Sequence, residues 1–183
     1  MFAELDCRTI TDRYSESALL FYRYRVRITG MHKLLIVSHS PSANARALTD
    51  AVVLGAKNEE IEGVDIRECP PLQADAEDVL WADGVILGTT ENFGYMSGAM
   101  KDFLDRIYYP CLEKTEGLPF VLFVKGGIDG QGAKNSVERI VTGLKWRQVQ
   151  PTLICKGEFK QDFLNDCENL GMTMAAGLEA GIF

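Results

Sequence analysis

Residues 33–46 read KLLIVSHSPSANAR, an apolar run that changes abruptly into small and polar residues. The run over 33–37 shows no alternation of apolar and polar positions, which is typical of a strand buried on both faces in a parallel sheet. The residues that follow predict a helix over 41–57, with Leu48 and Val52 along its apolar face. This stretch is therefore expected to form a strand, a tight loop and a helix.

The same strand-then-helix pattern recurs along the rest of the chain. Further strands are expected at 64–69, 84–87, 120–124 and 152–155, and helices at 75–81, 98–108, around 137–144 and around 163–174. This alternation predicts one α/β domain, a three-layer, doubly wound, five-stranded parallel sheet with right-handed crossovers and helices on both faces. We expect the strand order 2-1-3-4-5, which reverses direction between strands 1 and 3 and opens a crevice at their carboxyl ends.

Bulk composition excludes several classes of protein. The 183-residue chain carries a net charge of −7, which disfavours binding to nucleic acid or anionic lipid. No segment approaches the ~18 consecutive apolar residues of a membrane-spanning helix, so no membrane insertion is expected. The five cysteines are odd in number, none lies at CxxC spacing, and there are only two histidines. These counts predict reduced thiols in a cytoplasmic protein, with neither a disulfide framework nor a metal site.

The first thirty residues differ in charge from the rest. Residues 1–30 contain five arginines and four carboxylates, whereas the remainder carries eight excess negative charges. The segment lacks the apolar region and the small-residue cleavage site of a secretory signal. We expect residues 31–183 to form the α/β domain. Residues 1–30 are expected to be an N-terminal extension that is either disordered or not native, as an upstream start codon chosen in error would produce.

Loop 1, residues 38–46, carries side chains suited to an anion. Ser40 is expected to cap the following helix, with Pro41 at the first helical position, where a missing N–H costs nothing. The free amides of the first turn, the helix dipole and the side chains of Ser40, Ser42 and Asn44 then form a phosphate site. Simple capping by Ser40 is the alternative. The chain has neither GxGxxG after this strand nor GxxxxGK[ST], so a dinucleotide fingerprint or Walker loop is not supported.

Two further loops follow the third and fourth expected strands. Loop 2, residues 88–98, holds three glycines and the aromatic residues Phe93 and Tyr95 in a polar setting, and Ser97 is expected to cap the next helix. This composition suits a loop that lies against a flat ligand, and a tight turn with Phe93 in the core is the alternative. Loop 3, residues 126–132, has four glycines, which indicates either flexibility or close packing against a ligand.

These loops resemble the cofactor loops of a known family. Residues 40–45, SPSANA, resemble the flavodoxin phosphate loop T-x-T-G-x-T, with alanine replacing the glycine and the third hydroxyl residue. Residues 88–105, GTTENFGYMSGAMKDFLD, strongly resemble the pattern G-T-P-x-x-x-G-x-M-[ST]-x-x-M-K-x-F-[LI]-D of flavodoxin-like NAD(P)H-dependent FMN reductases and quinone oxidoreductases. Thr90 stands where that family usually has proline. The resemblance extends over about residues 33–180.

The resemblance implies a bound flavin mononucleotide (FMN) and the residues that hold it. Loop 1 would bind the phosphate, loop 2 would border the ribityl chain and the isoalloxazine ring, and loop 3 would cover the other edge of the ring. The implied FMN-binding residues are Ser38, Ser40, Ser42, Ala43, Asn44, Ala45, Thr89, Thr90, Glu91, Asn92, Phe93, Gly94, Tyr95, Gly126, Gly127 and Asp129. Because the flavin supplies the redox chemistry, no catalytic side chain is implied.

The resemblance also implies a function. The expected protein is an NAD(P)H-dependent oxidoreductase that passes two electrons through FMN to a quinone or similar small acceptor. Its partners would be NAD(P)H and that acceptor, and the exposed aromatic residues of loop 2 are compatible with a homodimer or higher homo-oligomer. A flavodoxin-type one-electron carrier is the alternative. A flavin-free binding module is a third reading, for which the alanines at Ala43 and Ala45 are the cue.

Overall fold

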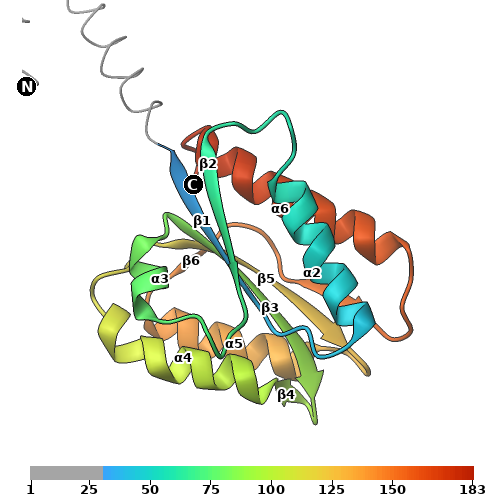
Figure 1. Cartoon of the computed structure of the whole chain (residues 1–183). Helices are drawn as coiled ribbons and strands as arrows, with labels where there is room; N and C mark the ends of the chain where they lie inside the picture. Colours follow the sequence, from blue (N-terminus) through green and yellow to red (C-terminus); the bar gives the residue numbers. More distant parts are fainter. Residues whose placement is uncertain (1–30) are drawn as a thin grey trace, which may run out of the picture.

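The computed structural model describes residues 31–183, so the expected extension, residues 1–30, lies outside the described residues. The parallel strands run in the order β2-β1-β3-β5, and β6 and β7 both pair with the outer edge of β5. Counted as one interrupted edge strand, β6 and β7 complete the expected order 2-1-3-4-5, which is confirmed. Figure 1 shows helices on both sides of this twisted sheet.

The elements alternate along the chain as expected, with two short additional strands. The strands are β1 (His32–Ser38), β2 (Val64–Cys69), β3 (Gly84–Asn92), β4 (Tyr95–Met96), β5 (Pro119–Gly126), β6 (Arg147–Gln148) and β7 (Leu153–Lys156). The helices are α2 (Ala43–Ala56), α3 (Ala76–Trp81), α4 (Gly98–Cys111), α5 (Gln131–Gly143) and α6 (Asp162–Glu179).

The sheet separates two apolar cores. Leu35 and Val37 of β1 pack in the core beneath α3, α4 and α5, whereas Leu34 and Ile36 pack in the core beneath α2 and α6 (Figure 1). All four side chains are fully buried. The apolar run at the start of the domain is therefore a strand buried on both faces, as its lack of alternation predicts.

Helices α2 and α6 touch backbone to backbone. A Cβ atom on Gly55 would lie 1.9 Å from the carbonyl oxygen of Glu168, and one on Gly171 would lie 2.0 Å from the carbonyl oxygen of Val52. Only glycine permits so close an approach, because any side chain at these positions would overlap the neighbouring helix. This contact fixes the position of α2, the helix that follows loop 1.

Two strands differ from the sequence expectation. The fifth strand, expected over 152–155, is found as β7, and a short strand that was not predicted, β6, precedes it on the same edge of β5; Pro151, which has no N–H to donate to a sheet, lies between the two. The third strand, expected to end at Leu87, continues to Asn92, because its last residues pair with β4 in an antiparallel hairpin. Loop 2 is thus partly a hairpin rather than an irregular loop.

Two further findings concern the cysteines and the apolar character of the helices. Among the described residues, Cys69, Cys111, Cys155 and Cys167 form no disulfide, and the last three are buried. Cys7 lies outside the described residues. Within residues 31–183, no helix combines the length and the apolar character needed to cross a bilayer.

Candidate functional site

The carboxyl ends of β1, β3 and β5 meet at one edge of the sheet. Ser38 pairs with Gly88, and Thr90 pairs with Lys125. The amide of His39 donates a hydrogen bond to the carbonyl of Gly88 at 2.9 Å, so loops 1 and 2 leave the sheet side by side. The parallel sheet therefore gathers all three loops at the point where the strand order reverses.

Helix α2 begins two residues later than expected. The expectation that Ser40 caps it, with Pro41 at the first helical position, is wrong. Ser42 is the N-cap, and its hydroxyl accepts a hydrogen bond from the Ala45 amide at 3.3 Å. Pro41 precedes the cap, where it stiffens the entry to the helix. The helix N-terminus still opens at the expected edge of the sheet.

A hydroxyl of α2 explains why Ser40 is not the cap. The hydroxyl of Ser40 bonds to that of Thr49 at 2.7 Å, and the hydroxyl of Ser38 bonds to the same Thr49 oxygen at 2.7 Å. Ser38 is buried, whereas Ser40 is partly exposed at the outer end of this chain of hydroxyls. Thr49 therefore holds loop 1 against α2, and Ser40 is the member that faces the site.

The first turn of α2 presents free donors. The amides of Ala43 and Asn44 have no acceptor within residues 31–183, as expected for the first two residues of a helix. Ser42, Ala43 and Asn44 are exposed, and no acidic side chain lies in this turn. Because a helix N-terminus carries partial positive charge, the turn favours an anion.

His39 places a second unsatisfied group in loop 1. Its Nδ1 atom is buried and has no hydrogen-bond partner among the described residues. Burial lowers the pKa of His39 from its ordinary value of 6.5, because the imidazolium form loses hydration. The ring is therefore neutral near pH 7, and one of its nitrogens is buried near the start of α2 without a hydrogen-bond partner among the described residues.

Buried hydroxyls hold loop 2 in place. The hydroxyl of Thr89 accepts a hydrogen bond from the Ser97 amide at 3.1 Å and lies 3.2 Å from the Ser97 hydroxyl. Ser97 caps α4, as expected, by accepting from the Met100 amide at 3.3 Å. The Met96 amide donates to Ser136 of α5 at 3.2 Å. Thr89 is only 2% exposed, so its side chain supports the loop from below.

The β3–β4 hairpin turns at Phe93 and Gly94. Both residues have positive φ angles, 53° and 73°, the combination that a two-residue type I′ turn requires. The side chain of Phe93 is fully exposed, so the alternative that it lies in the core is excluded. Just below the turn, the hydroxyl of Thr90 donates to the side-chain oxygen of Asn92 at 3.0 Å.

Loop 3 packs directly against this hairpin. The carboxylate of Glu91 accepts a hydrogen bond from the Gly130 amide at 3.1 Å. A Cβ atom on Gly132 would lie 1.8 Å from the carbonyl oxygen of Gly94, so no other residue fits there without movement. Of the two readings of the glycine-rich sequence, these contacts favour close packing, here between two loops of the chain itself.

The residues predicted for the site divide into supporting and open positions. Supporting side chains are either buried or bonded to a backbone amide; they are Ser38, Ala45, Thr89, Glu91 and Asp129, and the last accepts from the Gln131 amide at 2.9 Å. Gly126 is buried, and Ser40 and Thr90 are partly exposed. The open positions are Ala43, Asn44, Asn92, Phe93, Gly94, Tyr95 and Gly127, and Ser42 is also exposed although its hydroxyl accepts from the Ala45 amide.

Three residues at this edge were not predicted. Thr49 and Ser136 are buried polar residues on the apolar faces of α2 and α5. Lys125 is the only charged residue of β5 and directly precedes the glycines of loop 3. In each case the sequence has a polar residue at a position where the apolar pattern of its helix or strand calls for an apolar residue.

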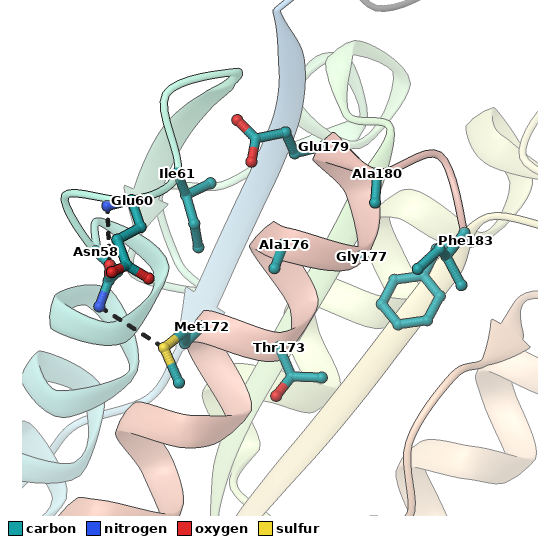
Figure 2. Close-up of a pocket in the computed structure, with 11 residues that line it drawn as sticks. Asn58, Glu60, Ile61, Met172, Thr173, Ala176, Gly177, Glu179, Ala180 and Phe183 are labelled. Carbon is teal, nitrogen blue, oxygen red and sulfur yellow. Dashed lines mark hydrogen bonds between the residues drawn. The ribbon is translucent and has the colours of Figure 1, made fainter.

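The described residues also form a groove at the other end of α2. It has a volume of about 510 Å³ and is lined by Asn58, Ile61, Met172 and Phe183, among others (Figure 2). The groove begins two residues beyond the last residue of α2, about 20 Å along this helix from loop 1. No residue predicted for the site lines it, so it is separate from the candidate site.

The strand order and the open helix start at its reversal point define the class of protein, a flavodoxin-like α/β protein. Residues 33–159 match the family described as NADPH-dependent FMN reductase. Because this match covers more than half of the chain, the protein belongs to that family, and FMN is its cofactor.

Individual relatives agree with this assignment. A flavodoxin of Aquifex aeolicus is 31% identical over 114 residues, which cover 62% of this chain and 60% of that protein. An NAD(P)H dehydrogenase (quinone) of Acidithiobacillus ferrooxidans is 29% identical over 94 residues, 42% of this chain and 47% of that protein. The chain thus spans less than two thirds of either relative. A flavodoxin structure from the domain Archaea has a TM-score of 0.69 at 19% identity, over 80% of this chain and 99% of that one, and shows the shared fold.

The residues present fit FMN. The free amides of Ala43 and Asn44 suit a phosphate, and both are backbone donors, which the alanines of loop 1 leave intact. The orphaned nitrogen of His39 adds a buried polar atom in need of a partner. A Cβ atom on Gly127 would meet no atom within 4 Å, so the backbone of loop 3 is open at this residue.

Proposed function

We propose that this protein is an NAD(P)H-dependent oxidoreductase that uses FMN to pass two electrons to a quinone or similar small acceptor. The family match and the quinone-dehydrogenase relative support this proposal. The structural observation that carries it is the open first turn of α2, where the amides of Ala43 and Asn44 face the edge shared with loops 2 and 3.

In this proposal the chain binds and orients the cofactor, and FMN supplies the redox chemistry. The first-turn amides of α2, with Ser42 and Asn44, hold the phosphate. The segment from Thr90 to Tyr95 borders the ring on one side, and the backbone of Gly126 and Gly127 closes the other edge. The supporting hydrogen bonds of Thr89 and Glu91 hold loops 2 and 3 in place, so these loops need little rearrangement to contact the ring.

A one-electron carrier is the second candidate. The flavodoxin of Aquifex aeolicus favours it, and so does the acidic charge of residues 31–183, which suits docking on a basic partner. The reductase is preferred because the family matched over residues 33–159 is named for NADPH-dependent reduction.

Anaerobic stopped-flow mixing of the FMN-loaded protein with NADH, and separately with NADPH, distinguishes the two candidates. We expect at least one of the nicotinamides to remove the visible flavin absorption within a steady-state turnover time, and a benzoquinone to restore it. Free FMN at the same concentration is the control. If the protein-bound flavin stays oxidised with both nicotinamides and is reduced only by dithionite, the carrier is supported and the reductase is refuted.

Two further parts of the proposal concern assembly and location. Phe93, Tyr95 and Ile128 expose large apolar side chains on loops 2 and 3, a pattern that suits a second subunit covering the site. Sedimentation velocity of the FMN-loaded protein tests this, and a monomer at all concentrations would refute it. Four free cysteines suit a reducing compartment, so we propose a cytoplasmic location, which fractionation of the source cells tests.

A further inference from the structure

Lys125, near the end of β5, carries a positive charge that is not paired with a carboxylate of the described residues. Its ammonium group donates a hydrogen bond to the carbonyl of Gly157 and lies 3.4 Å from the carbonyl oxygen of Gly126. The side chain is partly buried, and none of the ion pairs formed within residues 31–183 includes it. Because carbonyl oxygens carry only partial charge, most of the positive charge of Lys125 remains uncompensated at the site edge.

A backbone hydrogen bond fixes the peptide between Gly126 and Gly127. The Gly157 amide donates to the Gly126 carbonyl at 2.8 Å, so this carbonyl points toward the β7 side of the sheet. In a trans peptide the N–H points opposite to the C=O. The Gly127 amide therefore points toward β3 and loop 2, where it has no acceptor among the described residues.

We propose that Lys125 is a positioning residue that raises the reduction potential of the bound flavin. It holds the Gly126–Gly127 peptide so that the Gly127 amide donates to the ring, and its own charge favours the negative charge that the ring gains on reduction. A donor fixed in advance at the place where charge develops stabilises that charge without reorganisation. The proposal rests on the proposed function, because it requires FMN at this edge.

The charges nearby make the prediction specific. The carboxylates of Glu91 and Asp129 lie in the same pair of loops, and each is bonded to a backbone amide of loop 3. They oppose a negative charge on the ring, and Lys125 is the cation of β5 next to these loops. Removing it should therefore weaken the binding of reduced FMN more than the binding of oxidised FMN.

The test uses the FMN-loaded full chain and three variants. Lys125→Met removes charge and donor, Lys125→Arg keeps the charge, and Lys57→Met is the control, an exposed lysine at the other end of α2. The readouts are the dissociation constant of oxidised FMN and the two-electron midpoint potential. For Lys125→Met we expect the dissociation constant of oxidised FMN to change by less than about threefold. The preference for the reduced form should fall about tenfold, or about 30 mV.

The outcomes separate the inference from the proposed function. Lys125→Arg should keep most of the wild-type potential, and Lys57→Met all of it. An unchanged potential in Lys125→Met, or an equal loss of affinity for oxidised and reduced FMN, overturns the inference while the proposed function stands. If Lys125→Met fails to fold, Lys125→Gln replaces it with the same expectations. If the wild-type protein takes up no FMN, both proposals fall, and the titration shows this before any potential is measured.

Discussion

The carboxylate of Glu91, near the end of β3, accepts a hydrogen bond from the amide of Gly130, 3.1 Å away and directly before α5. The bond joins loop 2 to loop 3 across 39 residues of sequence. Glu91 was predicted as a residue that borders the cofactor. In the structure its carboxylate ties the hairpin of loop 2 to the start of α5, so that loops 2 and 3 are held in contact.

Removing this bond should loosen the contact between loops 2 and 3. For Glu91→Ala we expect a loss of about 1 kcal/mol in the free energy of unfolding, since a buried amide loses its acceptor. FMN affinity should fall by about tenfold, because the loops must then be ordered by the ligand. Urea unfolding and FMN titration measure the two effects, with the exposed Glu59→Ala as control. FMN binding as tight in Glu91→Ala as in the wild type would contradict the role given to this bond.

The contact between the hairpin and α5 should tolerate no side chain. In Gly132→Ala the new Cβ would overlap the carbonyl oxygen of Gly94, so the hairpin must move. We expect a cost of about 1–3 kcal/mol in unfolding free energy, together with weaker FMN binding. Gly98→Ala is the matched control for stability, because a Cβ there meets no atom within 4 Å. Equal stability of the two variants would show that the hairpin does not rest on α5 as described.

A negative charge in the first turn of α2 should separate binding from folding. Asn44→Asp places a carboxylate beside the free amides, where its attraction to the helix dipole should raise the free energy of unfolding by about 0.3–1 kcal/mol. The same charge repels a phosphate, so we expect the affinity for FMN to fall by at least about tenfold while that for riboflavin changes little. Equilibrium titration measures both ligands, and Asn169→Asp, an exposed position in α6, is the control. Equal losses for FMN and riboflavin would place the phosphate elsewhere.

His39 should make stability depend on pH on the acid side. Burial lowers its pKa below 6.5 in the folded protein, so below that pH the unfolded chain binds more protons than the folded one. The free energy of unfolding should therefore fall as pH drops from 6.5 through the folded pKa, and this component should be absent in His39→Asn. Urea unfolding at about pH 7.5 and about pH 5.5 measures it. The same pH dependence in both proteins would contradict the lowered pKa.

Much of the fold could be predicted from the sequence, because the patterns that decide it are local. The apolar run over 34–37 can be satisfied only by burial on both faces, and the structure buries it so. The block at 88–105 carried the family resemblance, and its N-cap at Ser97 is where the pattern placed it. The short strand β6 was not predicted, because its two residues, Arg147 and Gln148, are polar and exposed and give no apolar pattern.

The inner side of the site could not be predicted in the same way, because it depends on contacts between distant segments. Ser40 looked like a helix cap, but Thr49, the seventh residue of α2, bonds to its hydroxyl, and the cap is Ser42. Glu91 finds its partner in a loop 39 residues away. Such pairings leave no periodic signal, so the sequence identified which loops form the site but not which of their side chains support it.

The most direct test of the account is the uptake of FMN by the purified, flavin-free full-length protein, compared with uptake of riboflavin. We expect the protein to retain one FMN per chain through gel filtration, with the visible absorption of bound flavin, and to retain riboflavin far less well, because riboflavin lacks the phosphate that the α2 N-terminus binds. A protein that stays colourless with FMN, or that retains FMN and riboflavin equally, would contradict the claim that the free amides of Ala43 and Asn44 form the phosphate site.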